Sequence, residues 1–128
     1  MMIDNQTVLG RWCLTVDLER LSEGLFGRGM RLPVLVWIRA RGESAFHISE
    51  ASRATGYAHQ HVKKELDTLV DLGFLSAVPT VRRNDPKFFH PEVSYPLWAV
   101  ADTVTTLVRR GDLEDPRGLA GVIAPCGG

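Results

Sequence analysis

The feature that most constrains the fold of this chain is a pair of helical patterns joined by a tight turn in residues 49–73. Small residues follow Ser49, the expected N-cap of a short helix, and Gly56 ends that helix. A longer amphipathic pattern runs from about residue 58 to 72 and stops at Gly73. A short helix, a glycine-containing turn and a longer amphipathic helix together predict a helix-turn-helix.

The longer helix has two chemically distinct faces. Its apolar stripe consists of Val62, Leu66, Leu69, Val70 and Leu72. Its other side carries His59, Gln60, Lys63, Lys64 and Asp67. Residues three and four apart share a face of a helix, so we expect the stripe to pack on a core and the polar side to face outward.

Two short apolar segments follow, separated by polar, turn-forming residues. Residues 74–78 and 87–90 are the predicted strands, and Pro79 restricts the first of them to the edge of a ladder. The residues between them are too polar for a core and rich in turn formers. Three cations lie at the predicted tip: Arg82, Arg83 and Lys87. The pattern predicts a two-stranded hairpin with a basic tip.

Further helices are expected on both sides of this motif. One begins at Thr15 or Asp17 and ends at Gly27, and a nearly continuous apolar helix covers residues 31–41. We expect the second to be central and mostly buried. A last helix begins at about Pro96, with an apolar stripe of Leu97, Val100, Ala101, Val104, Leu107 and Val108.

The two ends of the chain carry weaker patterns. Residues 1–14 fit either a helix or an extended segment, and their conformation is left open. Residues 112–128 are rich in Gly and Pro and predict a flexible tail.

The distribution of charge favours an anionic partner for the middle of the chain. The sequence holds 15 Lys and Arg against 15 Asp and Glu, so its formal net charge is zero. Residues 28–90 carry ten bases against six acids, a net charge of +4, and each end carries a net charge of −2. This asymmetry places positive charge on the helix-turn-helix and the hairpin.

The middle of the sequence resembles a known group of regulators. The segment 25–32 followed by an apolar helix is similar to the opening of arsenical-resistance-repressor-like (ArsR-like) proteins. Residues 49–75 resemble the helix-turn-helix that this group shares with the multiple-antibiotic-resistance-regulator (MarR-like) group. The matching end of the longer helix consists of Leu66, Leu69, Gly73, Phe74 and Leu75. The resemblance covers roughly residues 25–95. It implies an α+β, mainly α fold: a winged helix-turn-helix with a two-stranded β-hairpin wing and flanking N- and C-terminal helices.

Both the resemblance and the charges predict a sequence-specific regulator of transcription that binds double-stranded DNA. The recognition helix, about 58–72, would enter the major groove, and the wing, about 76–90, would lie on the backbone or minor groove. The residues expected to contact DNA are Arg53, His59, Gln60, Lys63, Lys64, Arg82, Arg83 and Lys87. The alternatives left open are a winged-helix protein–protein interaction module and a regulator that responds to a metal or a small-molecule effector.

The flanking segments predict assembly into a homodimer. We expect residues 1–24 and the helix at 96–111 to mediate dimerisation, on either side of a DNA-binding domain at 25–95. The apolar residues that exceed the needs of one small domain are Leu9, Trp12, Leu18, Leu21, Leu97, Val100, Val104 and Leu107. Two-fold symmetry is the commonest in oligomers and matches palindromic DNA sites.

Catalytic and metal-dependent functions find little support in the sequence. His59 and His61 are two residues apart, whereas helical metal ligands need a spacing of three or four. No phosphate-binding glycine loop, nucleophile elbow or paired-carboxylate motif occurs. We therefore expect no catalytic residues, no metal ligands and no cofactor. Only two cysteines, no apolar run that could span a bilayer and no secretory signal lead us to expect a cytoplasmic protein.

Overall fold

The computed structural model describes residues 17–79, 82 and 87–120, and these contain five helices and a three-stranded antiparallel sheet. The helices are α2 (Leu18–Phe26), α3 (Arg31–Arg41), α4 (Ile48–Thr55), α5 (His59–Leu72) and α6 (Trp98–Arg109). The strands are β1 (Phe46–His47), β2 (Leu75–Val78) and β3 (Phe88–Pro91). The mixed α+β, mainly helical class is confirmed. None of these helices is both long enough and apolar enough to cross a membrane.

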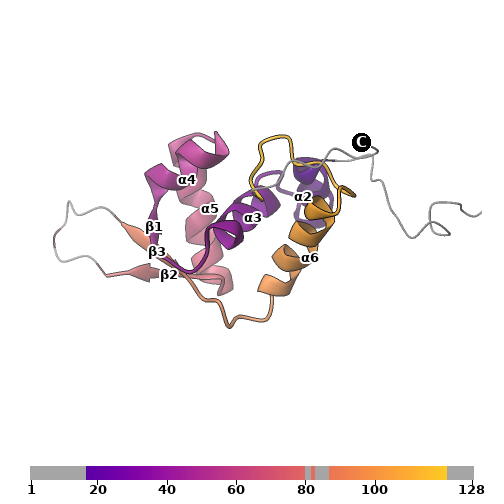
Figure 1. Cartoon of the computed structure of the whole chain (residues 1–128). Coiled ribbons are helices and arrows are strands. Elements are labelled where there is room, and N and C mark those ends of the chain that lie inside the picture. The colour runs from indigo at the N-terminus through magenta and orange to yellow at the C-terminus, as the bar shows by residue number, and fades with distance from the viewer. Residues whose placement is uncertain (1–16, 80–81, 83–86, 121–128) are drawn as a thin grey trace, which may run out of the picture.

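Helix α3 is the centre of the fold. It lies between α4 and α5 on one side and α2 and α6 on the other (Figure 1). Its buried residues are Leu32, Pro33, Val34, Leu35, Val36 and Ile38. Trp37 is partly buried and packs edge-on against Phe46, with 5.3 Å between ring centroids. The prediction of a central, mostly buried helix at residues 31–41 is confirmed.

The sheet has one more strand than the sequence predicted. The strand order is β1-β3-β2, so β3 is central and β2 lies at an edge and ends directly before Pro79. Strand β1 pairs Phe46 with Phe89. At two residues it is too short to produce an alternating pattern, and only its pairing with β3 defines it. The two predicted hairpin strands are confirmed, each displaced by one residue or less at its ends.

Helix α5 packs its apolar face against this core. Val62, Leu66 and Leu69 are fully buried, and Val70 is partly buried. Leu72 was expected in the same stripe but is 44% exposed. It is the last residue of the helix and lies at the rim of the stripe, where the chain turns away through Gly73.

Two helix starts differ from the expectation. Helix α4 begins at Ile48 with His47 as its N-cap, so Ser49 is not the cap. The reason is that β1 ends at His47, and the helix follows the strand without a linker. Helix α6 begins at Trp98, two residues after Pro96, because residues 95–98 first form a tight turn.

The predicted flexible tail is wrong for residues 112–120, and residues 121–128 lie outside the described residues. Leu113, Leu119 and Ala120 are buried. Glu114 forms a parallel bridge with Asp17, and its carbonyl accepts a hydrogen bond of 3.1 Å from the Leu18 N–H. The segment therefore packs against the start of α2 as part of the same core.

The apolar residues of α2 and α6 are largely used within one chain. Leu18, Trp98, Ala101, Val104 and Val108 are buried in the same cluster as the residues of α3 and α5. The sequence argument that took Leu18 and Val104 as surplus to the core is therefore wrong. Leu9 and Trp12 lie outside the described residues, and dimerisation itself stays a prediction.

Candidate nucleic-acid interface

The outward face of α5 displays the polar residues that the sequence assigned to it, and four of the five are exposed. His59, Gln60, Lys63 and Lys64 are all exposed. They lie opposite the buried face of the helix because α5 is continuous over its 14 residues and the helical period separates the two sets. The exposed set combines positive charge, a carboxamide and one imidazole on one side of a single helix.

The start of α5 is open to an anion. Ala58 is the N-cap, and no side chain among the described residues caps the helix there. The Ala58 carbonyl accepts from the N–H groups of His61 and Val62, as expected for a first turn. The remaining N–H groups and the positive end of the helix dipole therefore point out of the helix beside His59 and Gln60.

The hairpin lies next to the outward face of α5. Asp67 joins the two, since its carboxylate oxygens lie 3.5 Å from Lys63 Nζ and 3.4 Å from Lys87 Nζ. Lys87 also lies over the ring of Phe89, 5.4 Å from the centroid. The structure thus brings Lys63 and Lys87, from two elements, to one shared acid.

The other residues predicted to contact DNA lie outside α5, and the structure does not describe all of them. Arg53 is exposed near the end of α4, the helix that precedes the turn into α5. Arg82 is exposed in the segment between β2 and β3, and Arg83 lies outside the described residues. Helices α4 and α5 and the hairpin occupy one half of the molecule, and α2 and α6 the other (Figure 1).

A buried ion pair that the sequence analysis missed fixes α5 against α3. Glu65 is fully buried, and its Oε2 accepts a hydrogen bond of 2.8 Å from Arg31 Nε. Arg28 Nε lies 2.9 Å from the other oxygen, Oε1. The signal was present, because Glu65 lies three residues after Val62 and four before Leu69, on the apolar side. A charge at such a position requires a partner.

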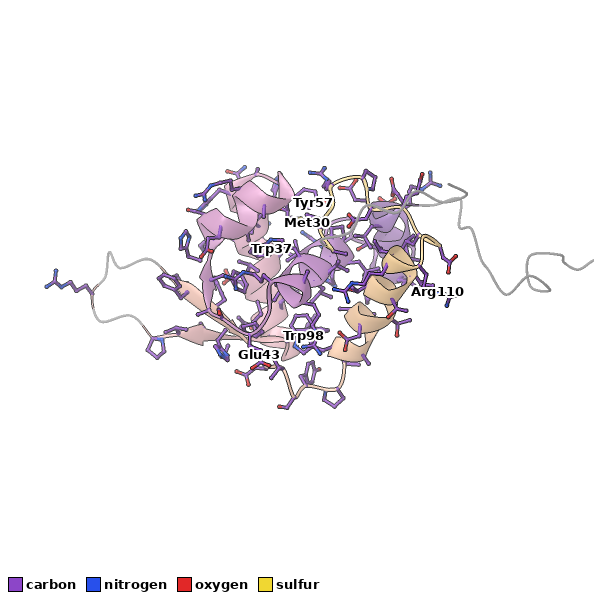
Figure 2. The ribbon with its side chains drawn as sticks, viewed as in Figure 1. Met30, Trp37, Glu43, Tyr57, Trp98 and Arg110 are labelled. Carbon is purple, nitrogen blue, oxygen red and sulfur yellow. The ribbon has the colours of Figure 1, made fainter. Side chains whose placement is uncertain are left out.

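A second missed cluster supports the turn between α4 and α5. Tyr57, labelled in Figure 2, donates a hydrogen bond to Glu19, and the Arg117 guanidinium lies 4.5 Å from the centre of its ring. Arg117 also donates to the Thr55 carbonyl and lies 3.3 Å from Glu19. Burial, then the Glu19 carboxylate, raises the pKa of Tyr57, so its hydroxyl stays a donor. Residues from α2 and from 112–120 thereby hold the turn that sets the start of α5.

Glycine is required at the centre of this turn. Gly56 has φ +80°, a conformation that side chains disfavour, and a Cβ there would lie 2.7 Å from Arg117 Nη1. The close approach of Arg117 to the turn thus depends on Gly56.

The sequence left open the alternative of a regulator that responds to a bound metal. Within the described residues, no three His, Cys, Asp or Glu side chains gather as ligands of one ion. Cys13 and Cys126 lie outside this part of the chain.

The chain was compared with protein-family models, with curated proteins and with solved structures, and none of the three comparisons finds a match.

Proposed function

We propose that this chain is a winged helix-turn-helix protein that binds double-stranded DNA as a regulator of transcription. The observation that carries the proposal is the exposed polar face of α5, set on a helix whose other face is fixed in the core. The element order α3, β1, α4, α5, β2, β3 is compatible with a winged-helix arrangement. A B-DNA major groove admits one α-helix, and the second helix of a helix-turn-helix reads it.

The proposed contacts divide into base reading and positioning. Gln60 is suited to a bidentate pair with adenine, and His59 and Lys63 lie close enough along α5 to reach neighbouring base edges. The residues proposed to contact phosphate or the minor groove are Arg53, Lys64, Arg82, Arg83 and Lys87. The uncapped start of α5 suits a phosphate oxygen, because helix N-termini bind anions through free N–H groups.

Binding titrations of two variants test this division. Gln60→Ala is expected to lose preference at particular base pairs, by ~1–3 kcal/mol for a good bidentate contact. The double variant Arg82→Ala with Arg83→Ala is expected to weaken matched and scrambled duplexes about equally. It should also flatten the log–log salt dependence by about two phosphate contacts, ~0.9 per contact. The measurement is fluorescence anisotropy on both duplexes at several salt concentrations.

Arg20→Ala provides the matched control, because Arg20 is exposed on α2, in the other half of the molecule. It should bind both duplexes like the wild type. If Gln60→Ala and the double arginine variant also bind like the wild type, these elements do not contact DNA. The chain is then better explained as a protein–protein interaction module, the alternative that its zero net charge favours.

The same proposal includes a two-fold homodimer, supported by apolar side chains that the core leaves exposed. Phe26, Leu72 and Leu97 are exposed and line one groove of about 160 Å³ together with Val100. A cluster of exposed apolar side chains such as this one marks an interaction surface. Leu97 and Val100 belong to the C-terminal helix from which the sequence predicted the dimer, and Phe26 lies two residues beyond the N-terminal segment, 1–24, of the same prediction.

Light scattering at tens of micromolar protein is expected to give twice the mass of one chain. Leu97→Glu should shift the equilibrium towards the monomer, because it places an unpaired charge in the buried surface. Val93→Glu is the control, since Val93 is exposed but does not line the groove. A monomeric wild-type chain would contradict the dimer.

A further inference from the structure

A polar cleft separates α3 from α6 and takes no part in the proposed DNA interface. It measures about 380 Å³ and is lined by Arg39, Ala40, Asp102, Thr105, Thr106 and Arg109. These residues come from α3 and α6 alone, and none comes from α4, α5 or the sheet. Its volume falls in the ~300–1,000 Å³ range of small-molecule sites.

The side chains of the cleft carry an excess of positive charge. Arg39 is held by Asp102, with Nε 2.6 Å from Oδ1 and Nη2 3.2 Å from Oδ2. A guanidinium has five N–H donors, so this pair leaves Arg39 with donors to spare. Arg109 is exposed at the end of α6, and the structure gives it no hydrogen bond or ion pair within the described residues. The cleft therefore combines one neutralised pair with one uncompensated cation.

A hydroxyl without a partner lies at the wall of the same cleft. Thr103 and Thr106, also on α6, donate to the backbone carbonyls four residues earlier, at 2.9 and 3.0 Å. Thr105 does not, although it is only 6% exposed, and its Oγ1 has no hydrogen-bond partner among the described residues. Buried hydroxyls are nearly always bonded, so this one points to a partner from outside the described residues.

We infer that the cleft between α3 and α6 binds a small oxyanion, a phosphate or carboxylate group on a soluble small molecule. Arg109 supplies the unpaired charge, and Arg39 is pre-oriented by Asp102 to donate its remaining N–H groups. Thr105, whose hydroxyl has no partner among the described residues, lines the same cleft. Asp102 accepts from a hydroxyl of the ligand, which favours a polyhydroxylated or hydroxy acid anion over a bare apolar acid. The site is independent of the DNA proposal.

NMR titration of the free protein tests this inference without DNA. Inorganic phosphate and citrate are the two probes, added at constant ionic strength to ¹⁵N-labelled protein. Either probe is expected to cause saturable shifts in the amides of residues 38–41 and 101–110. Arg109→Gln should weaken binding at least about tenfold, the usual value of a hydrogen bond to a charged group. Arg20→Gln is the matched control and should bind like the wild type.

Thr105→Val separates a ligand contact from a structural role. The two side chains have nearly the same shape, and the hydroxyl has no partner within the described chain. The variant is therefore expected to melt no lower than the wild type but to bind the probe about three- to tenfold more weakly. The inference fails if neither probe gives saturable shifts, or if Arg109→Gln and Thr105→Val both bind like the wild type. It also fails if Thr105→Val lowers the melting temperature, because the hydroxyl then serves the fold.

Discussion

Replacing Glu65 with glutamine is expected to lower the free energy of unfolding by about 3 kcal/mol. The carboxylate is fully buried between Arg31 and Arg28, and glutamine removes the negative charge while keeping the size. The side chain of Arg31 is only 15% exposed and is left with an uncompensated charge. Arg28 is 45% exposed and can turn to water, so the loss falls at the lower end of the range for a broken buried pair.

Urea unfolding followed by circular dichroism measures this change. Asp71→Asn is the matched control, because Asp71 is an exposed acid on the same helix, and its effect should stay within about 0.5 kcal/mol. The double variant Glu65→Leu with Arg31→Met should recover much of the stability, since an apolar replacement of both partners removes the stranded charge. If Glu65→Gln unfolds at the wild-type midpoint, the pair does not hold α5 to α3.

Loss of this pair also bears on the proposed interface. Glu65 lies on the opposite side of α5 from Gln60 and Lys63, so its replacement changes no proposed contact with DNA. Any loss of affinity that remains in a folded Glu65 variant would therefore come from the orientation of α5 alone. Such a loss would show that the proposed interface depends on a residue that does not belong to it.

The parts of the fold that could be predicted from sequence are those with local causes. Helices α3 and α5 have the predicted bounds because apolar spacing and a following glycine define each of them within a few residues. The turn at Gly56 was predicted for the same reason, since its left-handed conformation is a property of that residue. The polar face of α5 followed directly from the helical period.

The parts that could not be predicted depend on partners far away in the chain. The position of Glu65 on the apolar side of α5 indicates that it needs a partner, but the helical pattern does not identify that partner as Arg31, 34 residues earlier. Residues 112–120 have the composition of a tail, and their order comes from Leu18 at the start of α2 and from the turn at Thr55. The two residues of β1 acquire their conformation from β3, more than 40 residues later.

Helix α6 shows how the same local pattern allows two structures. An apolar stripe on a terminal helix fits a dimer interface and fits a shared core equally well, because periodicity identifies an apolar face but not what covers it. The sequence analysis assigned α6 to dimerisation. In the structure Trp98, at its start, is 2% exposed and packs edge-on against Phe74, with 5.1 Å between ring centroids.

Trp98→Ala is therefore expected to destabilise the whole chain by about 3–5 kcal/mol, as for other buried aromatic residues replaced by alanine. The lost ring leaves a cavity between α6 and Phe74, and Arg39, which lies 5.8 Å from the Trp98 ring, loses that contact as well. Trp98→Phe should cost much less, because it keeps an aromatic ring and because Trp98 Nε1 has no hydrogen-bond partner among the described residues. Thr103→Ala, an exposed change on the same helix, should stay within about 0.5 kcal/mol.

Two measurements decide what α6 does. Urea unfolding of Trp98→Ala should remain one cooperative transition at a lower midpoint, because α6 shares one core with α3, α4 and α5 and should unfold with them. The midpoint should move by the same amount at low and at high protein concentration. If α6 instead served mainly to join two chains, Trp98→Ala would leave the unfolding midpoint of the monomer unchanged and would show its effect as dissociation on dilution. That result would return α6 to the dimerisation role that its stripe first indicated.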